Sequence, residues 1–400
     1  MSPSDVKRSQ QKAAVKKFAD DGILNKVLIG GGPTGTISVA DFDGTSFDIV
    51  ANNTIPRTSP NWLLFKEPNI LYVVDENSNT TRLFNFDPDT NELGLIQNAT
   101  GSSGVVFLGF NKDKTIMVGA GFGEGTVDIW DVSAEDGTMK LLKKIPAGTT
   151  PGPVTGLQDS PHPHQALLDP SGRFFIVNDM GGDSLLILDS EADFNITNRI
   201  RVEPAGNGPR HGSFFPLGAD RASHYFLVSE LANLVKVFEL IYTDDDKGLE
   251  FKEIQSVSTF GDDFPPANPA TAAAGELVIS ADNKHLYVSN RLTGNKTDDI
   301  AHFSIDIIKD EPLAFVDQVS SGGILPRMFS LSMDDSVLFS TNQKGEIGLL
   351  AITRDADTGS LAEKPAASVA LDTFGASGFG PQFVIEVGAE GSNLGGLKKS

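Results

Sequence analysis

The sequence predicts an all-β fold: a seven-bladed β-propeller of four-stranded antiparallel blades, closed by pairing of its N- and C-terminal strands. The first observation behind this prediction is a repeat. Short apolar runs that end in polar or glycine residues recur at intervals of 45 to 61 residues, beginning at positions 26, 71, 116, 174, 225, 286 and 338. Seven units of similar size, each too small to bury its own apolar surface, are typical of blades arranged around an axis.

The second observation is the strand content of each unit. Each of the seven runs is followed by a turn and a second strand-like run, such as "TVDIWDV" at 126–132. Six of them are preceded by another apolar run, such as "QALLDPSG" at 165–172, and several are followed by a further short strand. The unit is therefore four short antiparallel strands, which we call A to D in chain order.

The third observation concerns closure of the ring. Residues 26–51 supply only strands B, C and D, and the missing A strand occurs at the far end, in "GPQFVIEV" at 380–387. Pairing the two ends in one sheet protects its edges, and neither a β-sandwich nor two β domains would require it. We expect one propeller domain over 26–390 and a tail over 391–400. Residues 1–25 form an N-terminal extension with a helical pattern, which Ser4 or Asp5 would cap.

The composition excludes several classes of function. The net charge of −21 leaves no basic face for nucleic acid or an anionic membrane. The chain has no cysteine, which excludes disulfides, thiolate catalysis and cysteine metal sites. No apolar run is long enough to span a membrane. The N-terminus lacks a signal-peptide pattern and predicts a cytoplasmic protein if Met1 is the native start; Asn-X-Ser/Thr triplets at 52, 79, 98, 195 and 295 keep secretion as the alternative.

Polar residues are expected to gather at one mouth of the central channel. Strand A lines the channel of a propeller, and A and B form an antiparallel hairpin, so the start of A and the end of B lie at the same face. The starts of A carry Asn61, Trp62, His162, His164, Arg210, His211, Glu276, Arg327 and Gln382. The ends of B carry Glu76, Asp179, Glu230, Arg291 and Gln343. Five charged or amide residues at equivalent positions of the B strands are not expected in an apolar core.

The pair His162 and His164 admits more than one interpretation. If the strand already begins at His162, both imidazoles point toward the same mouth, because residues two apart share one face of a strand. A His-X-His pair also suggests zinc, but three arginines at the same mouth would repel a cation, so we expect no metal site. Arginines instead suit an anionic or carbonyl-rich ligand. The glycine-rich "LIGGGPTG" at 28–35 lacks the lysine of a phosphate-binding loop and predicts only a turn. No cofactor is implied.

Several segments resemble a known family. "HPHQALLDPSGRFFIVNDMGGDSLLIL", "GNGPRHGSFFP", "GELVISADNKHLYVSNR" and "LPRMFSLSMDD" are similar to the lactonase-type seven-bladed propellers, which include a 6-phosphogluconolactonase and the fungal carboxy-cis,cis-muconate cyclase. The resemblance spans roughly 26–390 and is strongest from 151 to 360. It departs from the family pattern at Asn178, Met180 and Val278. It implies functional groups at the channel mouth, at His164, Arg210, His211, Glu230, Glu276, Arg291 and Arg327.

The resemblance and the charges together indicate three functions. The first is hydrolysis of a sugar lactone, either an aldonolactone or phosphogluconolactone, at the channel mouth. The alternatives are a muconate-type lactonising cycloisomerase and a non-catalytic propeller that binds a ligand or partner. The expected partner of the enzyme is a small lactone or carboxylate.

Each candidate residue has an expected role in the first function. Glu230 is the first choice for the general base and His164 the second, while Arg291 and Arg327 would hold the carbonyl oxygen and anionic groups. We expect neither Glu230 nor Arg291 to be a core residue. The further substrate-binding candidates are His162, Asp179, Arg210, His211, Glu276 and Gln343.

Overall fold

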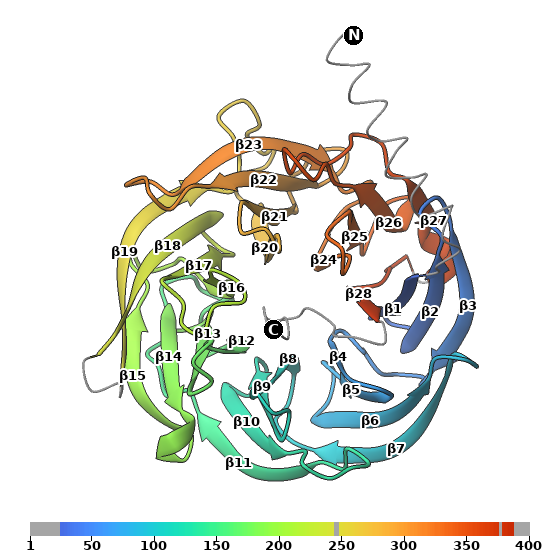
Figure 1. Ribbon diagram of the computed structural model, residues 1–400, viewed down its shortest axis with the longest axis horizontal. Helices are drawn as coiled ribbons and strands as arrows, with labels where there is room; N and C mark the ends of the chain where they lie inside the picture. Colours follow the sequence, from blue (N-terminus) through green and yellow to red (C-terminus); the bar gives the residue numbers. More distant parts are fainter. Residues whose placement is uncertain (1–24, 244–247, 376–377, 388–400) are drawn as a thin grey trace.

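The computed structural model describes residues 25–243, 248–375 and 378–387, and it is a ring of seven blades around a central channel (Figure 1). Each blade is a four-stranded antiparallel sheet. The fold predicted from the repeats is therefore confirmed. The predicted N-terminal extension, except for its last residue, and the predicted tail lie outside the described residues. Within the described ranges, no helix is long and apolar enough to cross a membrane.

The first blade joins the two ends of the chain. Strand β1 pairs with β28 on one side and β2 on the other, and Leu28 lies opposite Ile385. The last strand of the chain thus supplies the innermost strand of the first blade, as the sequence predicted. The blade consists of β28 (Phe383–Val387), β1 (Asn25–Gly30), β2 (Thr36–Phe42) and β3 (Phe47–Thr54).

The next three blades follow in chain order, each from the channel outward. The second is β4 (Leu63–Lys66), β5 (Ile70–Val74), β6 (Thr80–Asp87) and β7 (Glu92–Thr100). The third is β8 (Val105–Phe110), β9 (Ile116–Gly121), β10 (Thr126–Asp131) and β11 (Lys140–Pro146). The fourth is β12 (Pro163–Leu168), β13 (Phe174–Asp179), β14 (Ser184–Asp189) and β15 (Asn195–Arg201), with a 3₁₀ turn η1 (Ser190–Ala192).

The last three blades complete the ring. The fifth is β16 (Pro209–Phe215), β17 (His224–Ser229), β18 (Leu234–Tyr242) and β19 (Leu249–Ser258). The sixth is β20 (Ala273–Ile279), β21 (His285–Arg291), β22 (Asp299–Ile305) and β23 (Leu313–Ser320). The seventh is β24 (Phe329–Leu331), β25 (Val337–Thr341), β26 (Ile347–Thr353) and β27 (Ala367–Ala370), followed by η2 (Leu371–Phe374).

The core lies between neighbouring blades rather than in the channel. Every residue of β13 and β14 is buried, because both faces of these middle strands are covered by the adjacent blades. The outer strand β11 instead alternates between exposed and half-buried residues, as a strand at the rim should. Phe42 of the first blade packs edge-on against Phe339 of the seventh, with ring centroids 5.2 Å apart, and closes the apolar layer around the ring.

A buried carboxyl group makes this closure depend on pH. Glu386 of β28 is 5% exposed, and its Oε2 accepts a hydrogen bond from the Met333 N–H at 2.7 Å. Burial, with a smaller contribution from Asp334, raises the pKa of Glu386 from 4.5 to about 7. The folded protein therefore keeps this proton at pH values where the unfolded chain has lost it. The free energy of unfolding should fall as the pH rises from 4.5 to 7.

We expect Glu386→Gln to stabilise the protein at pH 8 and to have little effect near pH 5. Glutamine keeps the acceptor for Met333 and removes the buried charge, so the gain at pH 8 should be on the order of 2 kcal/mol. Urea unfolding at both pH values measures it, with the exposed Glu363→Gln as the matched control. A gain equal at both pH values would contradict the assignment to Glu386 ionisation.

Candidate active site

The inner strands of the third to sixth blades begin with β-bulges, and the last three of these bulges shape one mouth of the channel. In β12 the register shifts between Pro163 and Gln165, so that His164 is the extra residue. In β16 the same shift makes Arg210 the extra residue. In β20 the shift falls between Ala274 and Leu277 and includes Glu276. A bulge of this kind re-aims side chains at the end of a ladder, and all three side chains border one small cavity of about 10 Å³.

A chain of three buried groups runs across these blades. The His211 ring lies with Nδ1 2.8 Å from Glu276 Oε1 and with Nε2 3.1 Å from His164 Nδ1. A carboxylate only accepts hydrogen bonds, so the network assigns the His211 proton to Nδ1 and makes its Nε2 the acceptor for His164 Nδ1–H. His164 Nε2 is then left with a free lone pair. It has no hydrogen-bond partner among the described residues.

Burial keeps both imidazoles neutral at neutral pH. It lowers the pKa of His164 well below 6.5, and the positive charge of Arg210 lowers it further. Burial also lowers the pKa of His211, although the neighbouring Glu276 carboxylate opposes the shift. A neutral imidazole with an unprotonated Nε2 is the form that accepts a proton from water or a hydroxyl group.

Beside these three hydrogen-bonded groups, the Glu230 carboxylate forms ion pairs with two arginines. Glu230 Oε2 lies 2.8 Å from Arg210 Nε and 2.9 Å from Arg291 Nη2. Burial raises the pKa of Glu230, but the charges of Arg291 and Arg210 outweigh it, and the pKa is lowered overall. Burial and the charge of Arg291 lower the pKa of Arg210 to about 9, so Arg210 remains a cation at neutral pH.

The two arginines also hold the backbone of the sixth blade. Arg210 Nη1 donates to the carbonyl of Gly275, and Arg291 Nη2 donates to that of Ala274. Neither Nε–H group makes a hydrogen bond within the described part of the chain. The short contact of Arg210 Nε with Glu230 is an ion pair without hydrogen-bond alignment. Arg291 is 8% exposed. The expectation that it lies outside the core is therefore wrong.

A third arginine reaches the mouth from the seventh blade. Arg327 Nη1 and Nη2 donate to the two carboxylate oxygens of Glu76 at 2.9 and 3.1 Å, a bidentate pair. Asn61 Nδ2 donates to the same carboxylate. Arg327 borders the small cavity that His164, Arg210, His211 and Glu276 share. The structure thus brings together seven of the predicted residues: His164, Arg210, His211, Glu230, Glu276, Arg291 and Arg327.

Three other candidates lie outside this cluster. Strand β12 begins at Pro163 rather than at His162, and the bulge breaks the two-residue period, so the condition under which both imidazoles would share one face is not met. His162 stacks on Phe122 with ring centroids 4.3 Å apart, and its Nδ1 lies 2.8 Å from the Phe122 carbonyl oxygen. Asp179 is fully buried and accepts hydrogen bonds from the His162 and Gly181 N–H groups. Gln343 carries backbone hydrogen bonds to Leu325 and Gly380.

An aromatic floor, which sequence reasoning missed in part, closes the channel beneath the mouth. Trp62 packs edge-on against His211 at 5.7 Å, and Phe107 does so at 5.9 Å. Phe383 packs against Trp62 at 5.0 Å. The sequence pointed to Trp62 because it precedes a strand, but it gave no polar signal for Phe107 or Phe383. Trp62 and Phe107 thus cover His211, which is 2% exposed.

The arrangement combines a neutral imidazole, a relay that ends in a carboxylate, and three guanidinium groups. It can remove a proton from water at one point and stabilise a developing oxyanion at another. Among the described residues, no group of three or more histidine, aspartate or glutamate side chains is arranged to hold a metal ion.

Comparison with known proteins gives one family and several relatives. Residues 26–372 match the family model described as "Lactonase, 7-bladed beta-propeller". A probable 6-phosphogluconolactonase of Arthroderma benhamiae is 32% identical over 278 residues, which cover 68% of this chain and 67% of the relative. The 6-phosphogluconolactonase of Bacillus subtilis is 30% identical over 256 residues, which cover 64% of this chain and 67% of that relative. The structure of a periplasmic gluconolactonase from Pseudomonas aeruginosa superposes with a TM-score of 0.76 at 23% identity, covering 92% of this chain and all of that one.

Proposed function

The chain belongs to the lactonase family of seven-bladed β-propellers, and from that premise we propose that it hydrolyses a sugar lactone at the mouth of its channel. The relatives named as 6-phosphogluconolactonases support the sugar lactone as the class of substrate. The observation that carries the location is the hydrogen-bonded chain from Glu276 through His211 to His164 beside three arginines.

In the proposed reaction, His164 Nε2 takes a proton from a water molecule while the water oxygen attacks the lactone carbonyl carbon. The carbonyl oxygen becomes an oxyanion, and Arg327, which borders the same cavity as His164, is the proposed donor to it. When the oxyanion collapses, the bond from the carbonyl carbon to the ring oxygen breaks. The ring oxygen then takes the proton from His164, which leaves a hydroxy acid and a neutral imidazole.

The relay supports His164 as the base because it stabilises the imidazolium that forms. His164 Nδ1–H donates to His211, and His211 donates to the Glu276 carboxylate, so the positive charge develops two hydrogen bonds from a fixed negative charge. Glu230 is less suited to this task. Its Oε2 is already engaged in ion pairs with Arg210 and Arg291, whereas the Nε2 lone pair of His164 is free. We propose that Glu230 instead holds Arg210 and Arg291 in place.

A substrate panel tests the proposed function. We expect catalysed hydrolysis of at least one of gluconolactone, 6-phosphogluconolactone and an aldobionolactone, followed by proton release and corrected for spontaneous hydrolysis. Carboxymuconate in the same panel tests the cycloisomerase alternative. Cyclisation of carboxymuconate without hydrolysis of any sugar lactone would overturn the proposal.

A further inference from the structure

The two most deeply buried arginines of the mouth are already neutralised by a carboxylate. Arg210 and Arg291 share the Glu230 carboxylate. They also donate to the backbone carbonyls of Gly275 and Ala274. An anionic ligand could use these guanidinium groups only by displacing a buried carboxylate, which is costly because the displaced charge would lose its partner.

The third arginine of the mouth is paired as well. Glu76 holds Arg327 with both of its carboxylate oxygens, and Glu276 adds a negative charge beside His211. The two histidines of the relay are neutral at neutral pH, because burial lowers their pKa. The positive charges of this cluster, on Arg210, Arg291 and Arg327, are therefore balanced one for one by the negative charges on Glu230, Glu76 and Glu276.

The surface around the mouth adds further negative charge. It consists of the B–C turns and of the loops that lead into the A strands. In the described part of these segments the exposed cations are Arg57, Lys296 and Lys344, whereas the exposed acids include Glu124, Asp159, Asp262, Asp263 and Glu346. With the net charge of −21 of the whole chain, this surface repels an approaching anion.

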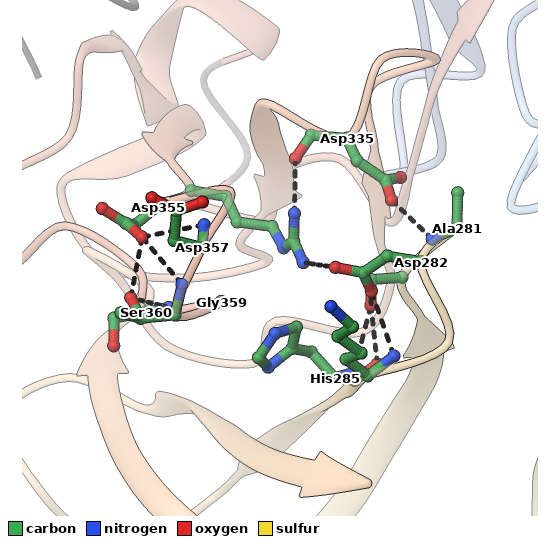
Figure 2. A network of polar contacts seen from close by, with 12 residues as sticks. Ala281, Asp282, His285, Asp335, Asp355, Asp357, Gly359 and Ser360 are labelled. Atoms are coloured by element: carbon green, nitrogen blue, oxygen red, sulfur yellow. Dashed lines mark hydrogen bonds and ion pairs between the residues drawn. The ribbon is translucent and has the colours of Figure 1, made fainter. Parts of the chain in front are cut away.

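The same pairing of arginine with carboxylate occurs at the A–B turns of the sixth and seventh blades, on the opposite face. Arg354 donates to Asp282 at 3.3 Å and to the Asp335 carbonyl at 3.4 Å, within the network that Figure 2 shows. Asp335 also accepts a hydrogen bond from the Ala281 N–H. Arg354 thus ties two turns together, and its charge is compensated where it lies.

We propose that the mouth selects an uncharged sugar lactone and discriminates against a phosphorylated one, an inference that rests on the proposed function. A phosphate monoester carries a charge of about −1.5 to −2 at pH 7. Its burial requires cations that are not already neutralised, and the guanidinium groups of the mouth each have a carboxylate partner. An uncharged lactone brings only hydroxyl and carbonyl groups, so it leaves the balance of charges unchanged. The names of the two 6-phosphogluconolactonase relatives do not imply this selectivity.

The test compares two substrates that differ only in the phosphate, glucono-δ-lactone and its 6-phosphate, at pH 7 and low ionic strength. We expect kcat/KM, corrected for spontaneous hydrolysis, to be at least about 10-fold higher for the uncharged lactone. Raising the ionic strength from about 0.01 to 0.15 M screens the repulsion, so it should increase kcat/KM for the 6-phosphate and barely change it for the uncharged lactone. An equal or higher kcat/KM for the 6-phosphate would overturn the proposal.

Glu76→Gln tests the balance of charges directly. The change leaves Arg327 with an uncompensated positive charge, so the activity on the 6-phosphate relative to the uncharged lactone should rise by about 10-fold. Glu346→Gln removes the same charge from an exposed position on the same face and is the matched control. We expect it to change the ratio by less than about 2-fold, because water and salt screen exposed charges. A ratio that stays unchanged in Glu76→Gln would contradict the proposal.

Binding measurements separate a failure of this proposal from a failure of the proposed function. Glucono-δ-lactam and its 6-phosphate are stable analogues of the two substrates, and isothermal titration of the full chain measures their affinities without turnover. We expect the uncharged lactam to bind at least about 10-fold more tightly. Equal or tighter binding of the phosphorylated lactam would overturn the selectivity, whatever the hydrolysis assays show. Preferential binding of the uncharged lactam without hydrolysis of any lactone would support the selectivity and overturn only the proposed function.

Discussion

Replacing His164 by alanine should lower kcat by about 10²–10⁴-fold while KM changes by only a few-fold. The imidazole is the proposed proton acceptor, and its loss removes an interaction that forms only in the transition state. The three arginines remain in place, so the substrate should still bind. Steady-state kinetics on the best lactone of the panel, corrected for spontaneous hydrolysis, measures both constants.

Two further measurements separate a lost base from a distorted site. Free imidazole should restore part of the activity of His164→Ala, because the small molecule can occupy the space of the missing ring. In the unchanged protein, kcat/KM should stay level around neutrality and fall only well below pH 6.5, since burial and Arg210 hold the pKa of His164 down. The control is His224→Ala, at the start of β17, at the end of the fifth blade away from the mouth. If His164→Ala keeps near-normal kcat, the assignment of the base fails.

The polar mouth could be predicted from the sequence because strand ends are a property of the repeat. Once the seven units are aligned, Glu230 and Arg291 occupy equivalent positions in adjacent blades, and the structure places them 2.9 Å apart at their nearest atoms. The same alignment predicted the closing strand, because the first unit lacks its A strand, and the last residues of the propeller supply it. Periodicity carries this information without any knowledge of side-chain packing.

The relay could not be predicted, because it depends on bulges. A bulge is set by how one strand pairs with its neighbour, and no local pattern in "SPHPHQ" shows that His164 is the extra residue. A strict two-residue period would put His162 and His164 on one face, whereas the bulge at His164 breaks that period. The contact between His164 and His211 joins two blades, and its geometry follows from packing between sheets.

The burial of the charged side chains could not be predicted from the sequence either. Arg210 is 2% exposed although arginine is rarely fully buried without a partner. Its partner Glu230 lies one strand away in the same blade, and the neighbouring blade supplies the covering residues and the Gly275 carbonyl. Burial of an ion pair depends on the packing of neighbouring blades, so the expectation that Arg291 lies outside the core failed.

This burial gives Glu230→Gln a large expected effect on stability. The change removes one charge that compensates Arg210 and Arg291, which leaves two buried cations close together. Removing one member of a buried ion pair typically costs about 3–5 kcal/mol. The Glu230 side chain is 17% exposed, so we expect a somewhat smaller loss, about 2–4 kcal/mol. Urea unfolding measures it, and the exposed pair of Glu239 with Lys252 gives the control Glu239→Gln, with a loss below about 1 kcal/mol.

The same variant decides between the two candidate bases. If Glu230 only positions the arginines, Glu230→Gln should raise KM, and the fall of kcat/KM at acid pH should persist because His164 still titrates. If Glu230 is the base, its loss should lower kcat by about 10²–10⁴-fold and abolish that acid dependence. The second result, together with normal kcat in His164→Ala, would return the catalytic role to Glu230. Loss of activity without loss of folding stability would show that its carboxylate does not hold the buried arginines.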